Sequence, residues 1–241
     1  MFSINSKQLR YTVFSTGLLG MALRWLLYAT GIDQKGLLIS NHWSAWSILI
    51  LTALILGLVL IATRKPTVPS GHLLLQSIGS LAAAAGIFVR SVTRYLAAGN
   101  IADRLPEILG IAAALGLLAA GICHLLKAKT PFLGHSAVCL FFAMQMISHY
   151  RSWSADPQLM DYCFHLIAFL FLMLTGYFLA AQDVRMGKPS ALTFCAMSAA
   201  YFCCVALPES GDAMLLIPCA LWAITCGVRS NTAEEKTHAN S

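Results

Sequence analysis

The sequence predicts an all-α, polytopic integral membrane protein, a bundle of about eight transmembrane helices. Of its 241 residues, 58% are hydrophobic and only 11% are charged, and the mean hydropathy is +0.72. A typical soluble domain has about 25% charged residues, so this chain has too few to cover a water-exposed surface. The composition excludes a disordered chain, a secreted disulfide scaffold and most water-soluble enzymes.

Eight apolar runs predict the individual helices, because a transmembrane helix needs about 20 mostly apolar residues. The first, 11–31, follows Lys7 and Arg10 and lacks a convincing cleavage site, so we expect a retained helix rather than a cleaved leader. The others are 43–63, 72–95, 105–127, 134–153, 159–182, 190–207 and 213–228. The last two are short, but the segment 207–212 contains proline, glycine and acidic residues and predicts a turn between them.

The basic residues predict the orientation of these helices. With the N-terminus placed inside, the inner segments hold twice as many Lys and Arg residues as the outer ones. The inner set is Lys7, Arg10, Arg64, Lys65, Lys127, Lys129, Arg185, Lys188, Arg229 and Lys236, and the outer set is Lys35, Arg90, Arg94, Arg104 and Arg151. This bias predicts a multi-pass protein of the cell membrane (the inner or plasma membrane) with both termini in the cytoplasm.

A weak internal similarity predicts two parallel halves of four helices each. A shift of 123 positions aligns 31–66 with 154–189, and nine of these 36 positions are identical, including Asp33 with Asp156 and His42 with His165. The predicted units are 1–127, 128–228 and a polar cytoplasmic tail, 229–241. The alternative is that two membrane segments have converged on a similar composition.

Polar side chains within the apolar runs indicate which helix faces turn away from lipid. Arg24 lies on a stripe of small or polar residues spaced four apart, and Arg90 and Arg94 are one turn apart. A pair of arginines on one helix face can bind a phosphate or carboxylate. The alternatives are that Arg24 extends along its helix to the membrane surface and that the pair binds lipid headgroups.

The fifth and sixth predicted helices add polar groups at a similar depth. Gln145 and His149 share one face, and Asp161 and His165 are four apart, a spacing at which a carboxylate can orient an imidazole. The alternative is that these side chains simply lie at the headgroup level. The full predicted ligand-binding set is Arg24, Arg90, Arg94, Gln145, His149, Asp161 and His165.

The basic residues at this outer depth are Arg24, Arg90, Arg94, His149, Arg151 and His165, and the acidic ones are Asp33, Glu107 and Asp161. If they converge, they form an outward-facing polar cavity with a positive balance. The favoured function is therefore binding or transport of a small anionic molecule or lipid headgroup from the outer side. The expected partners are membrane lipids, such an anion, and a membrane protein or a second copy of the chain. Nucleic acid is not expected, because no basic patch carries interleaved aromatic residues.

Two other functions stay open from the sequence. A non-catalytic membrane subunit or sensor would use the same polar residues for assembly with a partner. A haem-bearing redox subunit would use paired histidines near the two ends of the helices. These histidines are His42, His149 and His165 near the outer ends and His72, His124 and His135 near the inner ends.

The sequence gives little sign of catalysis. It lacks the common nucleotide-binding and hydrolase motifs, so we expect no catalytic residues and do not expect an enzyme. Its eight cysteines all lie in apolar segments without metal-binding spacing and are expected to pack as small side chains. No metal ligands and no cofactor are therefore expected.

Overall fold

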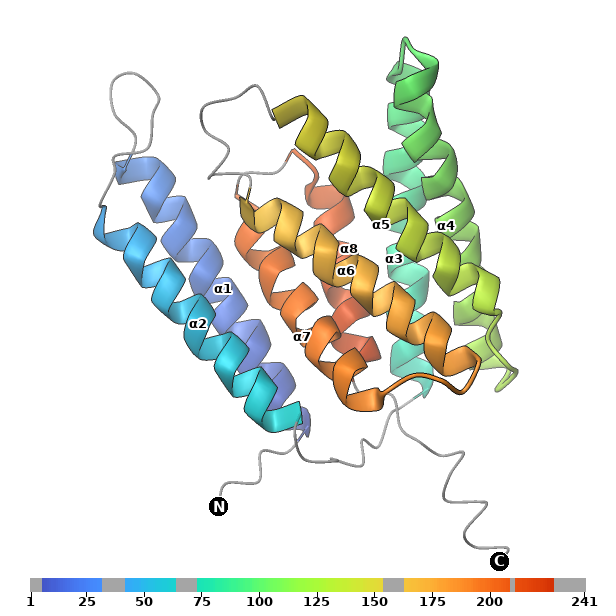
Figure 1. The fold of residues 1–241 in the computed structure, drawn as a ribbon, viewed down its shortest axis with the longest axis horizontal. Coiled ribbons are helices and arrows are strands. Elements are labelled where there is room, and N and C mark those ends of the chain that lie inside the picture. The colour runs from blue at the N-terminus through green and yellow to red at the C-terminus, as the bar shows by residue number, and fades with distance from the viewer. Residues whose placement is uncertain (1–5, 32–41, 64–72, 154–162, 209–210, 228–241) are drawn as a thin grey trace, which may run out of the picture.

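The computed structural model describes residues 6–31, 42–63, 73–153, 163–208 and 211–227. These residues form eight α-helices and no strands (Figure 1). The helices are α1 (Ser6–Thr30), α2 (Trp43–Thr63), α3 (Leu73–Ala97), α4 (Ile101–Leu125), α5 (Phe132–Trp153), α6 (Cys163–Asp183), α7 (Pro189–Ala206) and α8 (Ala213–Cys226). The predicted all-helical fold is confirmed for this part of the chain, and the tail 229–241 and Asp161 lie outside it.

Seven of the eight helices, α1 to α7, are long and apolar enough to cross a membrane. The eighth, α8, has only 14 residues and contains Pro218. A helix of that length rises about 21 Å at 1.5 Å per residue, which is less than the hydrocarbon thickness of about 30 Å. The expectation that the last helix is short is confirmed. In the view of Figure 1, α8 begins well below the top of the bundle, where α4 begins.

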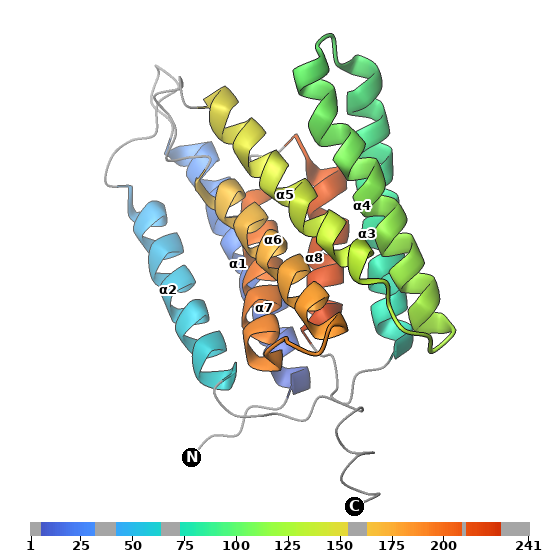
Figure 2. The same cartoon turned by 45° about the vertical axis from the view of Figure 1, so that its right-hand side comes forward.

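Six helices form a closed ring. Along α3 to α8 each helix packs against the next, and α8 packs back against α3 (Figure 2). The remaining two, α1 and α2, pack against each other and against the outside of α7. Because the ring joins α4 to α5 and α8 to α3, it crosses the boundary between the two predicted four-helix halves. The internal repeat stays a prediction.

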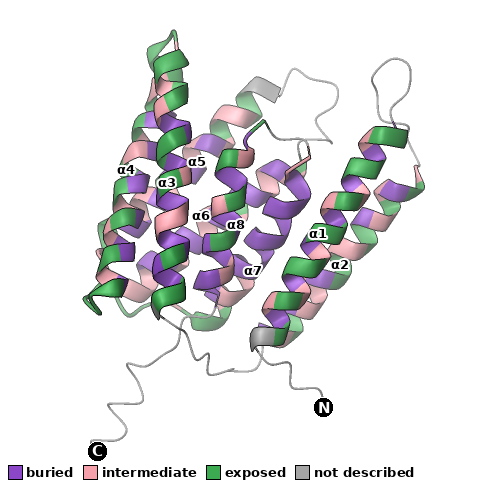
Figure 3. Cartoon of the chain, turned by 180° about the vertical axis from the view of Figure 1, so that it is seen from behind, coloured by how far each residue is buried: buried purple, intermediate pink, exposed green. Residues whose placement is uncertain are grey.

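Helix α7 is the most enclosed helix of the bundle because it contacts α1, α2, α6 and α8. Nearly all of its second half is buried (Figure 3). Its small residues allow this, since alanine, serine and cysteine let neighbouring backbones approach closely. Larger side chains fill the space between α6 and α7, where the rings of Phe171 and Phe202 stack with their centroids 5.5 Å apart.

Candidate functional site

A close approach of α3 and α8 brings opposite charges together. A Cβ atom on Gly86 would lie 2.6 Å from Pro218 Cγ and 2.7 Å from the carbonyl oxygen of Met214, so only glycine fits this crossing. Arg90 lies one turn beyond Gly86 on α3, and Asp212 directly precedes α8. The contact at Gly86 therefore places the side chains of Arg90 and Asp212 next to each other.

A second glycine brings α4 to the same place. A Cβ atom on Gly110 would collide with the hydroxyl group of Ser91 and would lie 2.8 Å from the ring of Phe141. Ser91 directly follows Arg90, and Glu107 lies one turn before Gly110. The carboxylate of Glu107 therefore faces the guanidinium group of Arg90 from α4.

Arg90 is the centre of the site, and its guanidinium group binds side chains from three other parts of the chain. Nε and Nη2 donate to the two oxygens of Asp212 at 3.3 and 3.2 Å. Nη1 donates to both oxygens of Glu107 at 3.3 Å, and Nη2 also donates to Gln145 Oε1 at 3.0 Å. A buried charge is tolerated only when it is paired and hydrogen-bonded, and Arg90, 3% exposed, meets both conditions.

Gln145 connects α5 to this network. Its amide oxygen accepts from Arg90, while its amide nitrogen donates to Glu107 Oε1 at 3.4 Å. Gln145 is only 1% exposed and Glu107 4% exposed. The amide thus bridges a cation and an anion in the protein interior, and α3, α4 and α5 are held together by side chains at this level.

Arg94 extends the network toward the surface. Its Nη2 donates to Asp212 Oδ1 at 2.7 Å, and its side chain is 46% exposed. The carboxylate of Asp212 therefore accepts from two arginines that lie one turn apart on α3. Arg94 is the exposed part of an otherwise buried set of charges.

Two histidines lie on the other side of Asp212. Nε2 of His149 is 3.6 Å from Asp212 Oδ2, beyond hydrogen-bonding distance. The ring of His149 packs against that of His165, with the centroids 5.3 Å apart, and His165 lies edge-on to Phe169 at 4.5 Å. We call Arg90, Arg94, Glu107, Gln145, His149, His165 and Asp212 the Arg90 cluster.

The charges of the Arg90 cluster balance, since two guanidinium groups face two carboxylates. Burial alone would raise the pKa of Asp212, but the adjacent guanidinium groups of Arg90 and Arg94 hold this pKa below its usual 3.8. Asp212 is therefore ionised at neutral pH. The positive balance expected from the sequence is not found among these charges, because Asp212 adds a second carboxylate to that of Glu107.

A metal ion fits this site poorly. Among the described residues, His149, His165 and Asp212 offer three ligand atoms within 4.8 Å of one another. Two imidazoles and one carboxylate can bind a transition metal. Both oxygens of Asp212, however, already accept from arginines, and these two cations would repel a divalent ion. A haem held between the two histidines would need their packed rings to separate.

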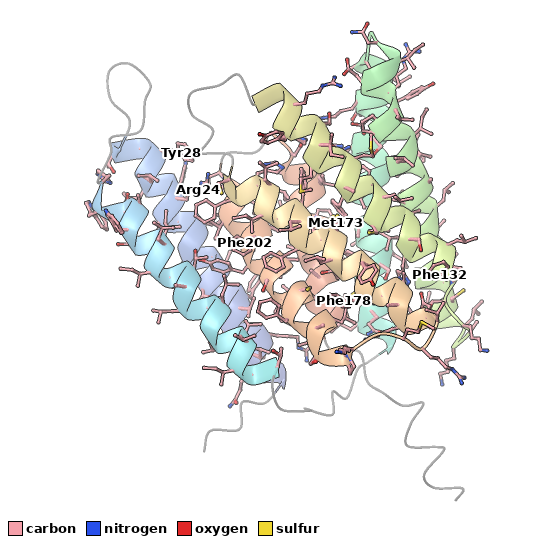
Figure 4. All side chains as sticks on the ribbon, viewed as in Figure 1. Arg24, Tyr28, Phe132, Met173, Phe178 and Phe202 are labelled. Atoms are coloured by element: carbon pink, nitrogen blue, oxygen red, sulfur yellow. The ribbon has the colours of Figure 1, made fainter. Side chains whose placement is uncertain are left out.

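Arg24 lies beside the Arg90 cluster, on α1. Its guanidinium carbon is 4.6 Å from the centre of the Phe164 ring and 5.8 Å from that of Tyr28, and its Nη2 donates to the Tyr28 hydroxyl at 3.3 Å (Figure 4). Arg24 is 2% exposed, so it faces protein rather than the outside of the bundle. Phe164 directly precedes His165, which makes α6 the link between Arg24 and the cluster.

The structure brings five of the seven predicted site residues into one cluster: Arg90, Arg94, Gln145, His149 and His165. Arg24 is adjacent to them. Glu107 was expected at this depth and Asp212 on the outer side, but neither could be identified from the sequence as a partner of Arg90. The available signal was that acidic residues occur at the same predicted depth as the arginines, but sequence spacing does not show which helices touch.

Comparison of the chain with family models, with curated proteins and with solved structures finds no match. Over the described residues, the fold and the site therefore define the class of protein: a helical bundle with seven helices long and apolar enough to cross a membrane and a buried ionic cluster near one end.

Proposed function

We propose that this chain is a multi-pass protein of the cell membrane that binds a small anion, a carboxylate or a phosphate, at the Arg90 cluster. With both termini in the cytoplasm, as the distribution of Lys and Arg favours, the cluster faces the outer side. The single observation that supports this most is the carboxylate of Asp212 between Arg90 and the half-exposed Arg94.

Asp212 occupies the place that a free anion would take. Two arginines one turn apart already bind one carboxylate, and a carboxylate or phosphate from solution offers the same acceptor geometry. An incoming anion first meets Arg94, the exposed member, and replaces Asp212 as its partner. Arg24, Gln145, His149 and His165 then surround the bound anion.

The test is ligand-dependent stabilisation of the detergent-purified protein. The anions tested are acetate, succinate and inorganic phosphate, each added at constant ionic strength. At least one of them should raise the Tm of the wild-type protein. The Arg94→Gln variant should lose at least half of that increase. Arg104→Gln is the matched control, because Arg104 lies on the same helical hairpin but donates to the carbonyl oxygen of Ala98.

Two outcomes would reject anion binding at this site. One is that none of the three anions raises the Tm of the wild-type protein. The other is that the increase is the same in the Arg94→Gln and Arg104→Gln variants, which would mean that the anion acts elsewhere.

A second function is supported by the mutual pairing of the charges in the Arg90 cluster. A non-catalytic membrane subunit or sensor needs such a network to fix its helices for assembly with a partner. It predicts co-purification with a membrane protein or a second copy of the chain, together with no effect of anions on the Tm. Transport, as distinct from binding, would require uptake of the stabilising anion into proteoliposomes.

A further inference from the structure

Two turns lie together at the end of the ring opposite to Asp212. One connects α4 to α5 and the other connects α6 to α7. Asp183, the last residue of α6, joins them: its Oδ2 is 2.6 Å from Nδ1 of His135 and its Oδ1 accepts from the hydroxyl group of Thr130. The side chains of His135 and Asp183 are 2% and 3% exposed, so this connection is buried.

The surface of these two turns is basic. Lys127 and Lys129 lie on the first turn, Arg185 and Lys188 lie on the second, and all four are exposed. Neither 126–131 nor 184–188 contains an acidic residue. The adjacent Asp183 is buried and hydrogen-bonded, which leaves its charge inside the protein rather than among the four bases.

The backbone of two of these bases is unusual. Lys127 and Arg185 have φ values of 53° and 62°, in the left-handed region that favours glycine. Each lies two residues beyond the last residue of its helix, at the position where glycine most often ends a helix. The negative ends of the helix dipoles of α4 and α6 favour cations there. A dipole does not explain the two further bases, Lys129 and Lys188, farther from the helix ends.

Apolar side chains lie among the charges. Leu126, Leu133 and Met186 are 72%, 77% and 85% exposed, respectively. An exposed surface that alternates bases with long apolar side chains suits a ligand that has an anionic group and a hydrocarbon part. A free phosphate would use only the bases, whereas a phospholipid would use both.

We infer that these two turns together form a binding site for the headgroup of an anionic phospholipid. The phosphate is bound between Lys127 and Lys129 on one turn and Arg185 and Lys188 on the other, and the buried contacts of Asp183 hold the two turns at the right spacing. Basic pockets between transmembrane helices bind anionic headgroups in this way. The inference does not depend on anion binding at the Arg90 cluster.

The experiment compares the purified protein in nanodiscs of phosphatidylglycerol and of phosphatidylcholine. The wild type should have a higher Tm in phosphatidylglycerol. In the double variant Lys127→Gly/Arg185→Gly, glycine suits the left-handed backbone, so the variant should be at least as stable as the wild type in phosphatidylcholine. It should lose at least half of the difference between the two lipids.

Arg104→Gln/Arg151→Gln is the matched control, since it removes the same charge from the opposite end of the bundle. This variant should keep the full difference between the lipids. A third arm adds inorganic phosphate to the wild type and to the double glycine variant in phosphatidylcholine. Any change in Tm should be the same in both proteins, because it would come from the Arg90 cluster and not from the two turns.

Three results would overturn the lipid site. The wild type could show no preference for phosphatidylglycerol, or the double glycine variant could retain the full difference. Stabilisation by inorganic phosphate that equals the effect of phosphatidylglycerol and is lost in the glycine variant would assign the bases to a soluble phosphate instead.

Discussion

Helices α5 and α6 are held differently at their two ends. Near Asp183 their backbones touch their neighbours: a Cβ atom on Gly134 of α5 would lie 2.8 Å from the carbonyl oxygen of Gly116 on α4, and one on Gly176 of α6 would lie 3.1 Å from the backbone nitrogen of Cys139. Near Asp212, by contrast, α5 is joined to α3 and α4 through Gln145 and charged side chains.

For α5 and α6, this difference separates a fixed end from an exchangeable end, whereas α3 and α8 are fixed near Asp212 by the contact at Gly86. Backbone contacts of glycines cannot change partners without moving whole helices. Hydrogen bonds from Arg90 and Arg94 can be transferred from one acceptor to another, because a bound anion offers the same chemistry as Asp212. We therefore expect small soluble anions to exchange at the Asp212 end and to leave the helix packing near Asp183 unchanged.

The largest expected effect comes from removing Asp212. Asp212→Ala leaves the buried guanidinium group of Arg90 without one of its two carboxylates, and breaking a buried ion pair costs about 3–5 kcal/mol. Unfolding by a denaturing detergent should measure this loss. Formate or acetate should restore part of it by occupying the vacated place, as an exchangeable carboxylate requires.

The matched variant at the fixed end is Asp183→Ala. It removes hydrogen bonds to His135 and Thr130 and is expected to cost about 1–3 kcal/mol. Added formate should stabilise the Asp183→Ala protein no more than it stabilises the wild type. Equal rescue of both variants would show that the two ends do not differ in the way proposed.

An effect of the same size is expected from Gly134→Ala, which tests the backbone contact directly. The added methyl group forces α4 and α5 apart, and overpacking of this kind costs about 1–3 kcal/mol. Gly57→Ala on α2 is the control, since a Cβ atom there meets nothing within 4 Å. A Gly134→Ala protein as stable as the Gly57→Ala protein would contradict a fixed end made by close backbones.

The smallest effect concerns pH. Arg90 and Arg94 hold the pKa of Asp212 below its usual value. Its contribution to stability is therefore fully present above the usual pKa of 3.8 and is lost as pH falls through the lower folded value. The Tm of the wild type should therefore fall on acidification below about pH 4. The Asp212→Asn variant should lack this part of the decrease in Tm. Identical curves of Tm against pH for the variant and the wild type would contradict a lowered pKa of Asp212.

Much of the site could be predicted from the sequence for a general reason. A polar side chain such as Gln145 within an apolar helix must turn toward protein, since lipid offers no hydrogen-bond partner. The helical spacing of Arg90 and Arg94 fixes their common face without any tertiary information. The partners could not be predicted in this way, because Arg90 and Asp212 are 122 residues apart in the chain.

The sequence by itself determined that the chain forms apolar helices, how long they are, and which of their side chains avoid lipid, because these properties depend on local composition and helical periodicity. Only the tertiary structure decided that α8 closes the ring against α3, since that depends on the fit of Gly86 against Met214 and Pro218. The same packing decided that Arg90 binds Glu107 and Asp212, because a buried guanidinium group pairs with whichever carboxylates the neighbouring helices bring to it.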